Sequence, residues 1–245
     1  MPISVALPPD IIMEEQKTMK TAIVTIDHDQ DVENPLEYGS WKLHSFCSKH
    51  RNYKHPSELG LGELDAYGEP RIENIGLKRK LEVGTAFILS YYEHGDGCWS
   101  LRGEGPQCQF DSTQIAGLLV WEGKPKDCGW ASELEPDGSC RRKKFETTLE
   151  ARAKNARSTL EVYNEWCNGH CYQYDIKEYD EETEEEGEDI DSSCGFIGDK
   201  HMMSGLRDAL QGTDIQIVKA EGDCAFIVKD ELPMVAEAKK EEVLA

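Results

Sequence analysis

The chain has 245 residues, of which 48 are acidic and 27 are basic, so its formal net charge is −21. This charge disfavours direct binding to DNA, RNA or an anionic membrane, because contact with phosphate needs clustered Lys and Arg side chains. No stretch approaches the roughly 20 apolar residues of a membrane-spanning helix, since the longest apolar runs, such as 115–121, are the size of a strand.

The N-terminal segment lacks the basic start and the long apolar region of a secretion signal, so a cytosolic setting is expected. The chain has nine cysteines, an odd number, which does not suggest a disulfide framework in a chain of this length. We expect most of them to be small buried side chains or free thiols.

Runs of β-branched and aromatic residues between turn-forming residues predict a series of strands. The strongest is 85–92, which a turn at 94–97 joins to the next strand as a hairpin. Residues 53–80 are rich in Gly and Pro, and we expect a long irregular connection with at most one short helix. The expected strands are 21–26, 39–47, 85–92, 98–101, 115–121, 171–179, 215–218 and 224–228.

Residues 145–167 show the clearest helical pattern, with a sequence that fits a capping box at 147–150 and a stop signal at 168–169. Apolar residues recur three and four positions apart and define one face, made of Leu149, Ala153, Ala156, Leu160, Tyr163 and Cys167. A second, short helix is expected at 204–210.

Strands separated by turns, together with this helix, predict an α+β fold with an antiparallel sheet, one long amphipathic helix and long irregular connections. We expect a flexible lead-in over 1–19 and a single domain over 20–233, which contains an acidic insertion at 175–191. A charged tail is expected over 234–245. The last two strands are expected to pair as a hairpin through a turn at 221–223.

The order of short motifs resembles a family of uncharacterised proteins encoded by bacteriophages and prophage remnants. The motifs include an acidic stretch with Pro35, a Cys/His/Arg/Tyr cluster and a strand–Glu-His-Gly–strand hairpin. They lie at 29–38, 46–53, 92–95, 110–117, 161–169 and 191–198. The chain departs from the family in the spacing between Cys47 and His50 and in its longer acidic insertion. The resemblance implies a phage origin and a host-cytoplasm setting, and it implies no mechanism.

In the first two of these motifs and between them, four aromatic or basic residues are candidate interaction residues, namely Tyr38, Trp41, Arg51 and Tyr53. The one basic region, 141–157, has a net charge of +5. It is compatible with contact to nucleic acid or to an acidic partner. We favour the alternative that it pairs with the protein's own acidic insertion.

Two groups of imidazoles and thiols are candidate zinc ligands, because these two ligand types together suit zinc. The first group contains His44, Cys47 and His50, near His55, and the second contains Cys167, His170, Cys171 and Cys194. On an extended strand His44 and His50 would point away from Cys47, so surface histidines beside a buried cysteine are the alternative. For the second group the alternative is that Cys167 simply completes the apolar helix face.

Nucleophilic catalysis needs a Cys or Ser beside a base that a third group holds in place. Cys98 with His94, and Cys47 with His50, are the candidate pairs, but neither lies in a recognisable catalytic motif. We therefore assign no catalytic residue, and a metal-dependent or thiol-based enzyme is the alternative function.

The acidic insertion holds eleven acids and one lysine, a net charge of −10. Its interaction residues are expected to be Glu181, Glu182, Glu184, Glu185, Glu186, Glu188 and Asp189. The leading hypothesis is a phage-encoded accessory protein that binds a host or phage protein in the infected cell, with a localised acidic projection that serves counter-defence. A virion structural component is a second alternative.

Overall fold

A computed structural model of the chain describes residues 19–50, 52–65, 69–131 and 145–235. These residues form two compact units, where the sequence predicts a single domain over 20–233. The larger unit comprises 28–172 and 195–201, and the smaller unit comprises the described residues up to Asp27, 173–194 and those from Met202 onwards. Among the described residues the fold is α+β, with four α-helices and mostly antiparallel strands.

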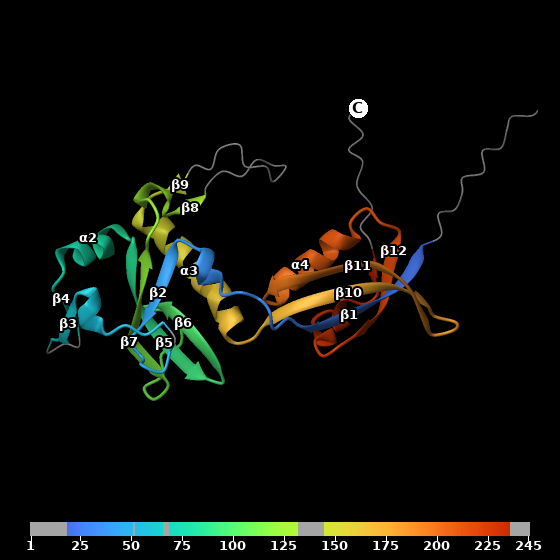
Figure 1. The fold of residues 1–245 in the computed structure, drawn as a ribbon, viewed down its shortest axis with the longest axis horizontal. Helices are drawn as coiled ribbons and strands as arrows, with labels where there is room; N and C mark the ends of the chain where they lie inside the picture. Colours follow the sequence, from blue (N-terminus) through green and yellow to red (C-terminus); the bar gives the residue numbers. More distant parts are fainter. Residues whose placement is uncertain (1–18, 51, 66–68, 132–144, 236–245) are drawn as a thin grey trace, which may run out of the picture. The chain divides into compact units, whose positions relative to one another are not determined.

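The larger unit contains a four-stranded antiparallel sheet in the order β2-β7-β5-β6 (Figure 1). Its strands are β2 (Trp41–Ser45), β5 (Ala86–His94), β6 (Asp96–Leu101) and β7 (Ser112–Trp121). The predicted hairpin is formed by β5 and β6, which turn at Gly95 with a φ of 90°. Each of the four strands overlaps a range expected from the sequence.

The helix expected over 145–167 is α3, Leu149–Cys167. The hydroxyl of Thr148 accepts a hydrogen bond from the N–H of Ala151 at 3.2 Å, and this cap sets where the helix begins. The inner four residues of the predicted face are buried, and these are Ala153, Ala156, Leu160 and Tyr163. Leu149 and Cys167, at the two ends, are exposed, so the buried face is shorter than the sequence pattern suggests.

Strand β7 is covered on both faces, which explains its continuous apolar run. Leu119 belongs to the apolar cluster formed with α3, whereas Leu118 and Val120 belong to a second cluster. That second cluster includes Leu61 and Leu77, which come from the region expected to be irregular. Neighbouring residues of a strand point to opposite faces, so the two clusters lie on opposite sides of the sheet.

The prediction of an irregular connection over 53–80 is wrong, because this region folds into four short elements. They are the 3-10 helix η1 (Pro56–Leu59), β3 (Leu61–Leu64), β4 (Pro70–Ile72) and α2 (Ile75–Val83). Gly60, with a φ of 85°, ends η1, and the Asn74 side chain accepts a hydrogen bond from the N–H of Leu77 at 3.0 Å to cap α2. The turn-forming residues therefore mark the ends of elements here.

The remaining elements of the larger unit are short. They are α1 (Pro35–Tyr38), the 3-10 helix η2 (Pro125–Asp127), β8 (Trp130–Ala131) and β9 (Phe145–Glu146). Strands β8 and β9 pair as an antiparallel two-stranded sheet. No helix among the described residues is long and apolar enough to span a membrane.

A five-stranded sheet in the order β11-β10-β1-β12-β13 forms the smaller unit (Figure 1). Its strands are β1 (Lys20–His28), β10 (Cys171–Asp180), β11 (Glu185–Ile197), β12 (Ile215–Glu221) and β13 (Met234–Val235). Helix α4 (Asp199–Leu210) begins earlier than the predicted 204–210 and buries Met202 and Leu206. The four-stranded sheet is antiparallel as expected, whereas in this five-stranded sheet β1 pairs parallel to β12.

The predicted C-terminal hairpin is also wrong. Residues 224–228 are not a strand but contain the 3-10 helix η3 (Ala225–Ile227), which is followed by η4 (Lys229–Glu231). The N–H of Cys224 donates to the carbonyl of Ile26 at 2.9 Å, so the chain is tied to the end of β1 and does not turn back along β12. The antiparallel partner of β12 is β13, with Ile217 opposite Met234.

Three expectations fall wholly or largely outside the described residues. The flexible lead-in over 1–19 lies there except for Met19, which is exposed. The charged tail over 234–245 begins with β13, and the rest of it lies outside. The basic run 141–144 also lies outside the described residues.

Candidate functional site: an acidic edge strand

The acidic insertion folds as a hairpin, in which β10 and β11 are neighbouring strands joined by the turn 181–184. The predicted interaction residues are all exposed, and they are Glu181, Glu182, Glu184, Glu185, Glu186, Glu188 and Asp189. Asp180 shapes the turn, because its carboxylate accepts hydrogen bonds from the N–H groups of Glu182 at 2.9 Å and Thr183 at 3.4 Å. These bonds hold the pKa of Asp180 below its ordinary value, so the turn carries a charged carboxylate.

The two strands of this hairpin differ in exposure. In β10, Tyr174 and Ile176 are buried, whereas the acidic half of β11 is exposed. The hydroxyl of Tyr174 donates to the carboxylate of Asp191 at 2.9 Å and thereby links the two strands. Burial and this hydrogen bond raise the pKa of Tyr174, so the phenol keeps its proton and the link. The hairpin is thus anchored through β10.

Strand β11 is the last strand of its sheet, with β10 on one side and no strand of the described residues on the other. An edge strand presents a row of backbone N–H and C=O groups that another extended chain can pair with. Five of the seven residues in 185–191 are acidic. Charged side chains on an edge discourage pairing between like copies, and they favour a partner of opposite charge.

A recess of about 480 Å³ lies near the turn of this hairpin, and its lining comes from β11, β10 and the start of β1. Its lining includes the carboxylates of Glu178, Asp180, Glu185 and Glu186. Two of these already have cationic partners within the protein, since Lys20 pairs with Glu178 and Lys177 pairs with Glu186 at 3.0 Å. The recess is therefore acidic overall and has the size and charge to accept a Lys or Arg side chain from a partner.

The first group of predicted zinc ligands lies on and after β2. His44 is half-buried in the strand, Cys47 is exposed, and the ring of His50 lies edge-on to the rings of Tyr91 and Trp99 with centroids 5.6 Å away. The N–H of His50 donates to the carbonyl of Cys47 at 3.1 Å, so a turn does follow the strand.

The second group lies at the end of α3, in the turn that follows it, at the start of β10 and on β11. His170 is hydrogen-bonded to Glu165 through Nδ1 at 2.6 Å, and Cys171 is buried, which raises the pKa of its thiol. Cys167 and Cys194 are exposed. Within 19–50, 52–65, 69–131 and 145–235, no three His, Cys, Asp or Glu side chains form a group that could hold a metal ion. Zinc binding thus stays a prediction from the sequence.

The candidate thiol–imidazole pair Cys98 and His94 is not joined by a hydrogen bond in the described structure. Cys98 accepts a contact from the amide of Asn164 at 3.7 Å, and burial raises the pKa of its thiol. His94 instead lies 3.5 Å from the carboxylate of Asp111. A thiol that keeps its proton is a poor nucleophile, so this geometry does not favour thiol catalysis at Cys98.

The aromatic residues predicted to contact a partner differ in how exposed their side chains are. Tyr38 and Tyr53 are 72% and 40% exposed, whereas Trp41 is 2% exposed and belongs to the core. The ring of Trp41 packs against Phe87 of β5 and Trp121 of β7, and its indole N–H donates to Asn155 of α3, so its assignment as a surface interaction residue is corrected. Arg51 lies outside the described residues.

Two arginines of the described part of the basic region, Arg152 and Arg157, are engaged within the larger unit. The guanidinium of Arg157 donates to both carboxylate oxygens of Glu104 at 2.9 Å and to Glu150 at 2.9 Å. Arg152 donates to the carbonyls of Cys128 and Pro125. These partners differ from the expected one, which was the acidic insertion.

The titration of His44 provides a test of its environment. Burial, with a smaller contribution from the charge of Lys54, lowers the pKa of His44. We expect an NMR titration to give a pKa below 6.5, and Lys54→Gln to raise it. The unfolded chain binds a proton at His44 at a higher pH than the folded chain does. Protonation of His44 therefore lowers the free energy of unfolding as the pH falls from 6.5 towards the pKa of the folded state.

Lys126→Gln is the control for this titration, because it removes an exposed lysine that makes no contribution to the shift. It should leave the pKa of His44 unchanged. A pKa of His44 at or above 6.5, or equal responses to the two substitutions, would contradict the assigned cause.

Comparison of the chain with protein-family models, with curated proteins and with solved structures finds no match.

Proposed function

We propose that the protein acts by binding another protein, and that the exposed edge of β11 is the surface that the partner pairs with. The observation that carries this proposal is the position of β11. Among the described residues this strand has a neighbouring strand on one side alone, and its segment 185–191 is mostly acidic. The proposal includes the setting that the motif resemblance implies, namely a phage-encoded accessory protein that meets a host or phage protein in the host cytoplasm.

A partner that matches this edge is an extended segment rich in Lys and Arg. Its backbone adds a sixth strand to the sheet, and main-chain hydrogen bonds supply affinity that does not depend on sequence. Its basic side chains lie along the carboxylates of β11, and one of them enters the acidic recess. Because these charges are exposed, the association should weaken as salt screens them.

The test uses the full chain labelled with ¹⁵N and a peptide in which lysine and valine alternate. We expect hydrogen exchange at alternate backbone amides of 185–191 to slow when the peptide is added, because those amides gain a hydrogen-bond partner. The same peptide N-methylated throughout keeps its charge but loses its N–H donors. It should bind at least tenfold more weakly, since it cannot complete the strand pairing.

A pair of variants separates the edge from overall charge. The edge-neutral variant carries Glu185→Gln, Glu186→Gln, Glu188→Gln and Asp189→Asn. The matched control neutralises four exposed glutamates outside the strands, at Glu37, Glu73, Glu82 and Glu161. Only the edge-neutral variant should lose binding. Equal losses in the two variants, or equal binding of the two peptides, would show that attraction is diffuse and would contradict pairing at β11.

A further inference from the structure

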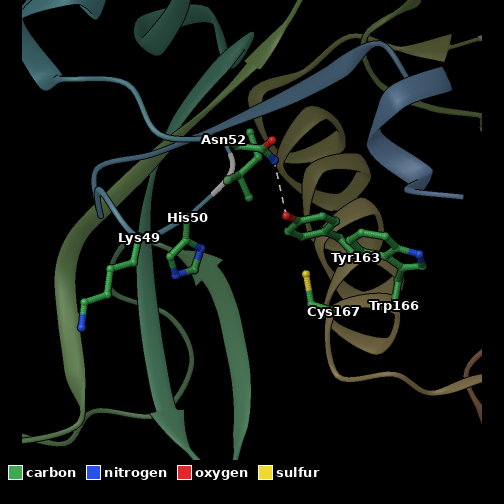
Figure 2. Close-up of a pocket in the computed structure, with 7 residues that line it drawn as sticks. Lys49, His50, Asn52, Tyr163, Trp166 and Cys167 are labelled. Atoms are coloured by element: carbon green, nitrogen blue, oxygen red, sulfur yellow. Dashed lines mark hydrogen bonds between the residues drawn. The ribbon is translucent and has the colours of Figure 1, made fainter.

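A pocket in the larger unit, separate from the acidic edge, has a volume of about 410 Å³. It is lined by Leu43, Lys49, His50, Asn52, Tyr163, Trp166 and Cys167. Figure 2 shows His50, from the segment after β2, and Cys167, at the end of α3, on opposite sides of the pocket. Pockets that bind small molecules have volumes of roughly 300–1,000 Å³, so the size suits a small organic ligand.

The walls of this pocket are held by contacts within the protein. The amide of Asn52 donates to the hydroxyl of Tyr163 at 3.5 Å, and the indole N–H of Trp166 donates to the carbonyl of Val32 at 2.8 Å. The rings of Tyr163 and Trp166 stack with centroids 5.8 Å apart. His50 is held edge-on to two further rings. An aromatic wall that is fixed in this way loses little conformational entropy when a ligand binds.

The described polar side chains that line the pocket are hydrogen-bond donors without an acidic residue among them. Among the described lining residues there is no carboxylate, although the chain as a whole has a net charge of −21. Lys49, His50, Asn52 and Tyr163 can all donate hydrogen bonds. Lys49 lies beyond His50 on the side away from α3 in Figure 2, so its ammonium contributes charge at the rim. The pocket therefore favours an anion that accepts hydrogen bonds.

We propose that this pocket binds a small organic carboxylate with a flat, apolar body. The carboxylate accepts hydrogen bonds from the amide of Asn52 and the imidazole of His50, and Lys49 adds attraction from the rim. The flat body lies against Tyr163 and Leu43, which supply aromatic and aliphatic contact. This site belongs to the larger unit and does not depend on the function proposed for β11.

The test follows benzoate binding to the ¹⁵N-labelled full chain by NMR, with benzamide and benzylammonium as neutral and cationic analogues of similar shape. We expect benzoate to bind most tightly and to shift the side-chain amide of Asn52 and the indole N–H of Trp166. Benzamide should bind roughly tenfold more weakly, because it lacks the charge that strengthens each hydrogen bond. Benzylammonium should not shift these signals.

Two substitutions and one control locate the site. Asn52→Ala should weaken benzoate binding by roughly tenfold through the lost charge-assisted hydrogen bond. Lys49→Gln should weaken it roughly two- to threefold, with a smaller effect at high salt. The control Lys54→Gln removes a neighbouring exposed lysine outside the lining and should have no effect. Equal affinity for benzoate and benzylammonium, signal shifts confined to other regions, or unchanged binding in Asn52→Ala would overturn the proposal.

Discussion

Replacing Trp41 with alanine should lower the free energy of unfolding of the larger unit by about 3–5 kcal/mol, the usual cost of removing a large aromatic side chain from a core. The ring is 2% exposed and packs against Phe87 and Trp121, with centroids 5.8 and 5.2 Å away. Its indole N–H also donates to the side chain of Asn155 in α3 at 2.6 Å. The substitution therefore leaves both a cavity and an unpaired amide oxygen.

Urea denaturation followed by tryptophan fluorescence measures this change, because all five tryptophans belong to the larger unit. Tyr38→Ala is the matched control, since Tyr38 lies nearby in sequence but is 72% exposed. It should change stability by no more than about 0.5 kcal/mol. If Trp41→Ala unfolded at the same urea concentration as the parent chain, the core position of this ring would be refuted.

Removing the charge from the edge of β11 should make the protein associate with itself. In the edge-neutral variant the outer backbone groups of β11 stay available for pairing, but four carboxylates no longer repel a second copy. Two such edges can then pair, as unprotected edge strands do in general. We expect a larger mean mass in sedimentation velocity for this variant than for the parent chain at equal concentration.

The control with four neutralised glutamates outside the strands carries the same net charge, so it separates edge protection from general solubility. It should sediment like the parent chain. High salt should move the parent chain towards the behaviour of the edge-neutral variant, because screening weakens the same repulsion. Equal mass in the two variants would show that the carboxylates do not guard this edge.

The sequence predicts well those elements whose pattern is local. Strand β5 follows from its β-branched and aromatic run, and the β5–β6 hairpin follows from the turn around Gly95. Helix α3 follows from apolar spacing of three and four residues and from the stop at Asn168 and Gly169. In each case, the signal lies within a few residues of the element that it predicts.

Elements and pairings that depend on distant residues were not predictable in this way. The parallel pairing of β1 with β12 joins segments from opposite ends of the chain, and local spacing carries no information about it. The 3-10 helix η3 forms where Cys224 bonds to Ile26, which is likewise a distant contact. The burial of single aromatic residues also depends on distant contacts. The sequence alone therefore does not distinguish the buried Trp41 from the exposed Tyr38.

For the candidate sites, too, the sequence shows which residues are present but not which of them the fold brings together. The acidic run was evident from composition, but its position on the edge of a sheet depends on the order of strands. The pocket brings together His50 and Cys167, which the sequence placed in two separate groups of metal ligands. Nothing near either residue in the sequence indicates the other, so this juxtaposition needed the structure.

The division of the chain into units has a consequence for biosynthesis. The larger unit is nearly continuous in sequence, so most of it can fold while the ribosome is still adding later residues. The smaller unit is assembled from three separate stretches, and β1 acquires its partner β12 only after residues 215–221 have been made. During translation β1 can pair with β10 once residues 171–180 have been made, but a chain cut off before residue 215 would leave the other side of β1 without β12.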